Sequence, residues 1–206
     1  AQIQRVPQYT DCPVSGTVTP LSGWNGSWGG IFSVMCKGTM NLSGSINASG
    51  LGFRGGSRGL KSSDETQGNG ADGEGYPRPS ARIANNRHAN GNGGGPGDFW
   101  PSGLSWSCGD GGAGGGGGGN GTSGENGGDI PGHGGGGFGG ISSGNPELTI
   151  MTFGGGGGGG ASGGRDGCGA DGFDGGNGGG IVVILTRQLN LYGAITVAGN
   201  QGSGSP

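Results

Sequence analysis

Seven consecutive glycines, Gly154–Gly160, form a segment that has no side chain to bury. Glycine loses more backbone freedom on ordering than any other residue, so such a run is ordered only if something holds its main chain. The hydrophobic effect cannot act on it, which leaves hydrogen bonds between neighbouring extended segments. The same need for main-chain hydrogen bonds extends to much of the chain, because 64 of the 206 residues are glycine and only 28% are hydrophobic.

Glycine at every third position suits the polyproline II conformation, which has three residues per turn and no internal hydrogen bonds. Two such helices can approach closely and bond to each other. The sequence predicts polyglycine II packing in two period-three series: Gly109, Gly112, Gly115, Gly118, Gly121, Gly124 and Gly127, and Gly169, Gly172, Gly175 and Gly178. The alternative is an irregular set of glycine loops on a β core.

Apolar residues gather in short, β-branched runs bounded by glycine, at 31–36, 40–48, 148–153, 181–186 and 189–198. Such runs indicate strands, and no segment has the 3.6-residue apolar period of a helix. We therefore expect an all-β fold with almost no α-helix. The expected core is a small β-sandwich or jelly roll of short strands, with inserted polyglycine II helices and long loops.

An internal repeat relates residues 40–50, MNLSGSINASG, to residues 189–199, LNLYGAITVAG. Each copy follows a glycine pair and an apolar run, and alternate positions are apolar, which predicts one buried face. The regions 31–50 and 181–199 are therefore expected to form similar strand–turn–strand units, side by side or in facing sheets. Gly44 and Gly193 mark either a bulge or a close approach of another backbone.

The whole chain, 1–206, is interpreted as a single domain. Residues 1–30 form an N-terminal extension, whose alternating apolar residues suggest a donor strand for a neighbouring subunit's sheet. Residues 51–180 form a glycine-rich insertion that contains the strand 148–153.

Cysteines and glycosylation signals indicate the compartment. A chain with a thin core and four cysteines favours two disulfides, with three pairings open among Cys12, Cys36, Cys108 and Cys168. The first residue is Ala1, which fits a mature product after signal-peptide removal or a chain trimmed for expression. Glycosylation acceptor patterns occur at Asn25, Asn41, Asn47 and Asn120. We expect a secreted protein, extracellular or at the cell surface.

Several functions are disfavoured. The net charge of −3 without a basic run argues against nucleic acid binding, and no run approaches a membrane span. His88 and His133 stand apart from other ligand-type residues, and no nucleophile or phosphate-binding motif is present, so we expect neither an enzyme nor a cofactor. Asp171 and Asp174, with Asp72, match part of a calcium nonapeptide, although Asp-Gly turns explain them more simply. Trp24 with Trp28 and Trp100 with Trp106 are expected to cap the thin core.

The glycine tracts Gly114–Gly119 and Gly154–Gly160, separated by polar loops, resemble the tip adhesins of T-even-like phage tail fibres. That resemblance implies a polyglycine II sandwich whose loops touch a receptor. The period-three segments also resemble springtail antifreeze proteins, which are disulfide-linked bundles of the same helix. The repeat N-L-x-G-x-I-x-[AV]-x-G with its glycine tracts is most similar to secreted glycine-rich surface and filament proteins of microbes.

The sequence supports two hypotheses about function, which belong to different classes of protein. The first is a structural subunit that self-assembles through backbone hydrogen bonds into an extracellular filament, tube or surface layer, with copies of itself as partners. The alternative is an adhesin that binds a receptor or glycan through loops 57–90 and 98–108. Ice binding is a third hypothesis and requires a flat, regular face.

Overall fold

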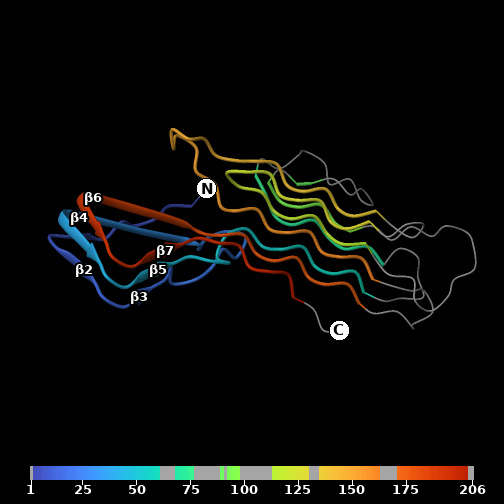
Figure 1. Ribbon diagram of the computed structural model, residues 1–206, viewed down its shortest axis with the longest axis horizontal. Coiled ribbons are helices and arrows are strands. Elements are labelled where there is room, and N and C mark those ends of the chain that lie inside the picture. The colour runs from blue at the N-terminus through green and yellow to red at the C-terminus, as the bar shows by residue number, and fades with distance from the viewer. Residues whose placement is uncertain are drawn as a thin grey trace, which may run out of the picture.

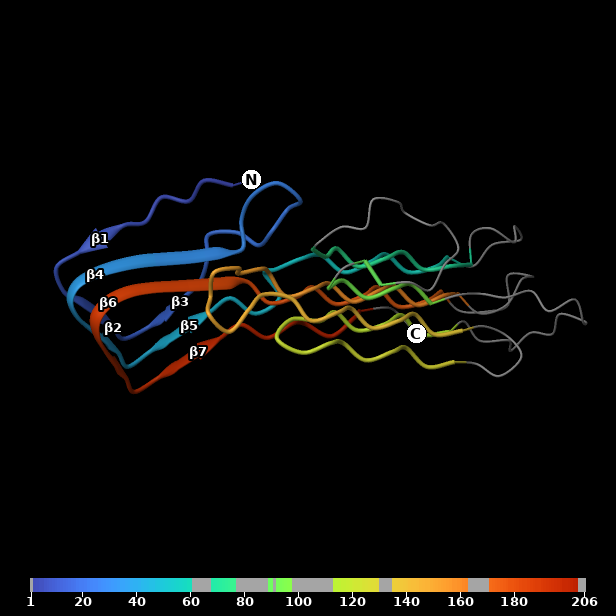
Figure 2. The same cartoon turned by 90° about the horizontal axis from the view of Figure 1, so that it is seen from above.

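Figure 1 shows the computed structural model of the chain, which describes residues 2–60, 68–76, 89–90, 92–97, 113–129, 135–162 and 171–203. The strands lie at one end of an elongated molecule, and extended glycine segments run side by side away from them (Figures 1 and 2). The described residues contain no helix, which confirms the predicted all-β class. They accordingly include no helix that is long and apolar enough to cross a bilayer.

Three stretches of the chain, which we call rungs, stack on one another and each turns a sharp corner (Figure 1). The first rung contains β1 (Gln8–Tyr9), β2 (Cys12–Val14) and β3 (Thr17–Val18). The second contains β4 (Ile31–Leu42) and β5 (Ser45–Asn47), and the third contains β6 (Ile181–Leu191) and β7 (Ala194–Thr196). Strands β1, β2, β4 and β6 form one sheet, and β3, β5 and β7 form the other.

The pairing of the second and third rungs follows the sequence repeat residue by residue. Met40 pairs with Leu189 and Leu42 with Leu191 between β4 and β6, and Ile46 pairs with Ile195 between β5 and β7. The two copies therefore lie side by side in one stack rather than in facing sheets. The register shifts once, between Cys36 and Thr39, which is a β-bulge.

The strand directions differ from those of the expected sandwich or jelly roll, because every pair of named strands is parallel. A jelly roll consists of antiparallel strands. Apolar alternation shows which face of a strand is buried but carries no information about the direction of its neighbour. The rungs are parallel because each of them begins on the side of the stack that faces the extended glycine segments. Long connections return the chain to that side before the next rung starts (Figure 2).

The N-terminal extension pairs with its own chain. Strands β1 and β2 lie against β4, and β3 lies against β5, all in parallel register. Residues 8–18 therefore complete the sheet of their own molecule along one edge, and addition of this segment to another subunit's sheet stays a prediction. Backbone pairing thus joins the extension to the second rung on both sides of the corner.

The predicted strand 148–153 is also absent, and a turn takes its place. Asn145 organises this turn, since its carbonyl oxygen accepts from the Leu148 amide at 3.0 Å and its Oδ1 accepts from the Ile150 amide at 2.9 Å. Leu148 has a φ of 56°, which few non-glycine residues adopt. The apolar composition suggested a strand, but no neighbouring strand lies here to pair with it.

Each rung has one arm before its corner and one arm after it. The hydrophobic core lies between these two arms, in the inner angle of the corner. It consists of Cys12, Val34, Cys36, Met40, Leu42 and Ile46, with Val14, Phe32, Val182, Ile184 and Ile195 packed against it. Cys12 and Cys36 form a disulfide that joins the first rung to the second, with their Cα atoms 6.1 Å apart. The core is small, and the second rung supplies most of it because it alone has a rung on each side.

The extended glycine segments form what we call the glycine bundle. Its described segments are residues 52–59, 68–75, 92–97, 113–119, 124–129, 135–141, 153–162 and 171–180, with 199–203 alongside. Segment 153–162 lies at its centre, and all of its residues except Gly157 are buried. The bundle thus surrounds the segment that has the fewest side chains.

Hydrogen bonds of the central segment repeat every third residue in three directions, with N···O distances of 2.7–3.0 Å. Gly154, Gly157 and Gly160 donate to Gly179, Gly176 and Phe173; Gly155, Gly158 and Ala161 donate to Gly119, Gly116 and Ala113; and Gly156, Gly159 and Ser162 donate to Glu74, Ala71 and Gly68. Segments 52–59 and 92–97 in turn donate to its carbonyl oxygens. A period of three in extended backbone is the geometry of polyglycine II.

Three aromatic rings pack where the rungs meet the bundle. Trp24 lies 5.2 Å from Phe153 and 6.1 Å from Phe53 between ring centroids, and the two phenylalanines are 5.3 Å apart. Trp24 therefore pairs with these rings, whereas Trp28 is exposed. This cluster is a hydrophobic contact between the bundle and the strand end.

Candidate functional site

The two outer edges of the rung stack are the most distinctive surfaces of the described molecule. The first rung pairs with the second on one side only, and the third rung likewise pairs only with the second. On their outer sides no strand of the described chain is bonded to them. Unpaired strand edges expose N–H and C=O groups that can bond to another chain.

Each rung has a glycine at its corner, and these three glycines lie in one column through the stack: Gly16, Gly44 and Gly193. A Cβ on Gly44 would overlap the carbonyl oxygen of Gly16, and a Cβ on Gly193 would overlap that of Gly44. The close-approach interpretation of Gly44 and Gly193 thus agrees with the structure. Gly16 differs, because a Cβ there would meet nothing within 4 Å.

The hydrophobic side chains of the inner angle form columns whose exposure depends on the rung. Leu42 is 0% exposed and Met40 is 1% exposed, whereas their partners Leu191 and Leu189 are 52% and 39% exposed. The residue types are alike, so the difference comes from position alone. The third rung presents apolar side chains that a further rung would cover.

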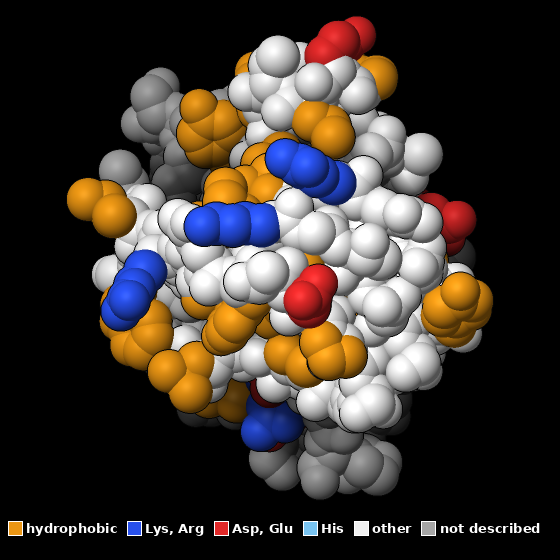
Figure 3. All heavy atoms as spheres, turned by 90° about the vertical axis from the view of Figure 1, so that its left-hand side faces the viewer, with side chains coloured by type: hydrophobic (Ala, Val, Ile, Leu, Met, Phe, Trp, Pro, Cys, Tyr) orange, Lys and Arg blue, Asp and Glu red, His pale blue; other side chains and the backbone are white. Residues whose placement is uncertain are grey.

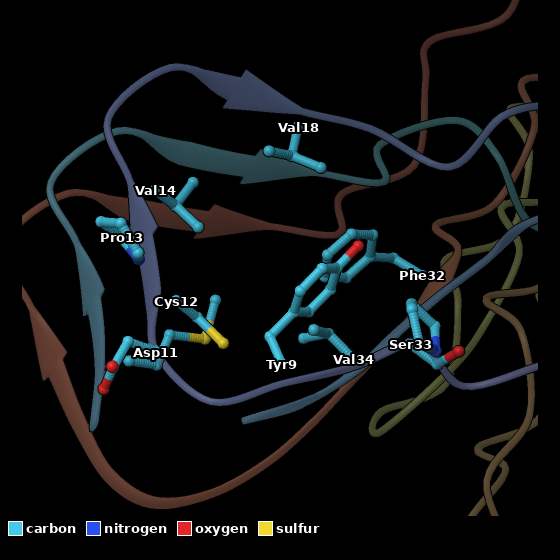
Figure 4. Close-up of a pocket in the computed structure, with 11 residues that line it drawn as sticks. Tyr9, Asp11, Cys12, Pro13, Val14, Val18, Phe32, Ser33 and Val34 are labelled. Carbon is cyan, nitrogen blue, oxygen red and sulfur yellow. The ribbon is translucent and has the colours of Figure 1, made fainter. Parts of the chain in front are cut away.

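At the opposite edge, the inner angle opens into a cavity of about 400 Å³. Hydrophobic residues from the first two rungs dominate its lining, and Figure 4 shows Tyr9, Cys12, Phe32 and Val34 around the space between the two arms of the corner. The stack therefore has an apolar hollow at one edge and exposed apolar side chains at the other.

Charged groups are sparse at this end of the molecule, as Figure 3 shows. Asp11 belongs to the first rung, Lys37 to the second and Arg187 to the third, and all three side chains are exposed. Lys37 and Arg187 directly follow the paired residues Cys36 and Thr186, whereas Asp11 directly precedes Cys12, which pairs with Met40. The first rung thus carries one acidic side chain near the corner, and the other two rungs carry one basic side chain each.

A separate polar cluster lies beside Trp24. The Glu74 carboxylate pairs with the Arg54 guanidinium and accepts hydrogen bonds from the Arg54 amide at 3.1 Å and Trp24 Nε1 at 3.0 Å. Burial alone would raise the pKa of Glu74, but the bonds and charge of Arg54, with the Trp24 bond, outweigh burial and lower it. The bond to Glu74 likewise raises the pKa of Arg54. The cluster ties segments 52–59 and 68–75 to the aromatic junction.

The lowered pKa of Glu74 implies that the stability of the fold depends on pH. A carboxylate with a depressed folded-state pKa stabilises the fold above its unfolded pKa, and that stabilisation is lost as pH falls through the folded value. Glu74→Gln should therefore lower the melting temperature at neutral pH and converge with the wild type in acid. Melting curves from pH 7 to pH 3 test this, with Glu147→Gln on an exposed turn as the control. A constant difference at every pH would contradict it.

The aspartates considered for calcium do not form a common site. Asp174 Oδ1 accepts from the Arg58 amide at 2.8 Å, and its backbone pairs with Ser203. Asp72 and Asp171 are also engaged in contacts within the molecule. Across the described parts of the chain, no three His, Cys, Asp or Glu side chains gather as metal ligands would.

The predicted glycosylation sites at Asn25, Asn41, Asn47 and Asn120 are all exposed. Two of them take part in side-chain pairs between the second and third rungs: Asn41 Oδ1 accepts from Asn190 Nδ2 at 2.8 Å, and Asn47 Oδ1 accepts from Thr196 Oγ1 at 3.0 Å. Glycan attachment at these residues stays a prediction.

The predicted polyglycine residues that are described lie in the bundle or at its turns. Gly115, Gly118, Gly124, Gly127, Gly172, Gly175 and Gly178 each face a carbonyl oxygen of a neighbouring segment, whereas Gly121 is exposed with nothing within 4 Å of a Cβ. Gly109, Gly112, Gly169, Cys108, Cys168, His88, His133, Trp100, Trp106 and loop 98–108 lie outside the described residues, as does much of loop 57–90.

The first rung is a third and shorter copy of the repeat, and the sequence contains a signal for it. Residues 14–18, VSGTV, have the pattern of residues 42–46, LSGSI, and the structure pairs them in that register. The match is five residues long, which is too short to stand out in a chain rich in serine and glycine.

Comparison with known proteins gives no relative. No family model matches the chain, and no curated protein or solved structure matches it. The open edges of the rung stack and the apolar side chains beside them are the features from which a function can be inferred.

Proposed function

We propose that this chain is a structural subunit of an extracellular filament, tube or surface layer, and that it self-assembles through main-chain hydrogen bonds. The observation that carries the proposal is the three-rung parallel stack, which is open at both edges and has exposed apolar side chains on the third rung. A chain that only had to remain monomeric would gain by covering or blunting such edges.

Charge and covalent structure support the same proposal. A net charge of −3 over 206 residues opposes association weakly. The Cys12–Cys36 disulfide fastens the first rung, which forms one open edge, to the second rung. Disulfides persist in oxidising compartments, which agrees with a role outside the cell.

A second candidate is an adhesin that uses the glycine bundle as a rigid support. The turn at 141–151 favours it, because Ile141, Leu148, Ile150 and Met151 are all exposed there. Clustered exposed apolar side chains are a common mark of a partner surface. Such an adhesin would remain a discrete particle at concentrations at which a structural subunit polymerises.

Negative-stain electron microscopy and sedimentation of the purified chain separate these candidates. The structural proposal predicts fibres, tubes or sheets whose amount rises steeply above a threshold concentration. Because main-chain hydrogen bonds and apolar contacts drive assembly, the threshold should change little with salt. A monodisperse monomer at every concentration tested would overturn the proposal and favour the adhesin.

A further inference from the structure

We propose that copies of the chain stack head to tail, with the first rung of one copy bonded to the third rung of the next. This inference rests on the proposed function and specifies its interface. The parallel register that joins second and third rungs within a copy would continue across the junction. Val14, Thr17 and Val18 of one copy would then lie opposite Leu191, Ala194 and Ile195 of its neighbour, as the internal pairings imply.

Gly16 provides the first argument. Within one copy, glycine is required at Gly44 and Gly193 because the carbonyl oxygen of the preceding rung occupies the place of a Cβ. Gly16 has the same position in its rung, but nothing lies near it and its φ is not positive. A monomer gives no steric reason for glycine there. In the head-to-tail stack, the carbonyl oxygen of Gly193 from the neighbouring copy would supply that reason.

The hydrogen bonds at the corner provide a template for the junction. The Val14 carbonyl oxygen accepts from the amides of Ser43 and Gly44, each at 2.9 Å, and the Leu42 carbonyl oxygen accepts from those of Tyr192 and Gly193 at 2.8 and 2.9 Å. The same pattern repeated once more would have Leu191 of one copy accept from Ser15 and Gly16 of the next. The outer groups of both edges therefore match as donor and acceptor.

The apolar surfaces are complementary in the same orientation. The exposed side chains of Leu189 and Leu191 project from the third rung in the column that contains Met40 and Leu42. The cavity at the first rung opens between the arms that hold Tyr9 and Phe32 (Figure 4). Stacking would cover both with hydrophobic contacts.

Pro13 limits the strength of this junction. The Val14 carbonyl oxygen points to the second rung. Because the backbone groups of successive residues in a strand point to opposite sides, the Pro13 nitrogen points away from the second rung and toward the junction. Proline has no N–H, and the junction consequently has one donor fewer than the pairing of second and third rungs. Proline on an edge strand restrains indiscriminate pairing. The stacking is therefore expected to need a threshold concentration.

The geometry determines the kind of assembly. The first and third rungs are different surfaces, so the contact is heterologous and leaves an open edge on each end copy. Such contacts produce filaments when the rotation does not close. Three rungs at about 4.8 Å each predict a rise of about 14 Å per subunit along the stack.

Two variants with one matched control test the proposal. Gly16→Ala adds one methyl group where the monomer has open space, so its melting temperature should stay unchanged while its assembly threshold rises at least about tenfold. Gly121→Ala adds the same group at another open position, away from the rungs, and should assemble like the wild type.

Cysteine cross-linking tests the register. Thr17→Cys copies mixed with Ala194→Cys copies should form an intermolecular disulfide, found by mass spectrometry of peptides, because opposed residues of adjacent strands lie within disulfide range. Thr17→Cys with Thr196→Cys is two residues out of register and should not. If the wild type polymerises but Gly16→Ala polymerises equally, or the 17–194 link is absent, this interface is wrong while the proposed function stands. If the wild type does not polymerise, both are wrong.

Discussion

Replacing Gly158 by alanine should lower the melting temperature by about 6–12 °C. A Cβ at this position would overlap the carbonyl oxygen of Gly95, so segments 92–97 and 153–162 must separate. Separation would weaken bonds such as that from the Gly97 amide to the Gly159 oxygen. Loss of about three main-chain hydrogen bonds costs about 3 kcal/mol at roughly 1 kcal/mol each, which corresponds to that shift for a chain of this size.

The adjacent residue provides a matched control. A Cβ on Gly157 would come no closer than 3.4 Å to another segment, which is an ordinary contact. Alanine also reduces the freedom of the unfolded chain, so Gly157→Ala should leave the melting temperature unchanged or raise it slightly. Equal effects of the two variants would contradict the bundle packing, because a loose glycine loop would not distinguish neighbouring positions in one run.

Removing the Cys12–Cys36 disulfide should have the second large effect. The bond spans 24 positions, and closing a loop of this length stabilises a fold by roughly 3–4 kcal/mol through the unfolded chain. The double variant Cys12→Ser, Cys36→Ser should therefore release the first rung, since the short strands β1–β3 pair with the second rung alone among the described strands. Hydrogen exchange followed by mass spectrometry should show lost protection in residues 8–18 and unchanged protection in 153–162.

The outcome of that experiment also bears on assembly. If the first rung is released, the double variant should lose polymerisation together with the protection of residues 8–18. A variant that keeps full protection there would show that backbone pairing with β4 and β5 suffices, and the disulfide would then be unnecessary for the edge. The single variant Ser15→Ala, at an exposed position of the same rung, serves as the control for substitution in this segment.

Much of the architecture could be predicted from particular residues. The repeat that aligns Met40 with Leu189 also predicts the register of β4 and β6, because copies with the same alternation pack best when their apolar columns coincide. The glycines at 44 and 193 were expected at a bulge or a close approach, and the structure shows the close approach. Both inferences depended on side-chain patterns that occur twice.

Other features could not be predicted, for physical reasons. In Gly154–Gly160 every position is alike, so the sequence cannot show that a Cβ on Gly158 would overlap Gly95 whereas a Cβ on Gly157 would make only ordinary contacts. The choice depends on where the partner segments lie. Parallel strand direction was missed because alternation is the same in either direction. The run LTIMTF suggested a strand, but Asn145 instead organises a turn whose apolar side chains reach the surface.

Amide hydrogen exchange in residues 154–162 tests most directly whether main-chain hydrogen bonds hold this molecule together. Each of these nine amides donates to another segment, although seven of the residues have no side chain. All nine should exchange only with global unfolding, more slowly than the exposed Gly121 and Gly128. Exchange of the run at the rate of these exposed glycines would contradict the account.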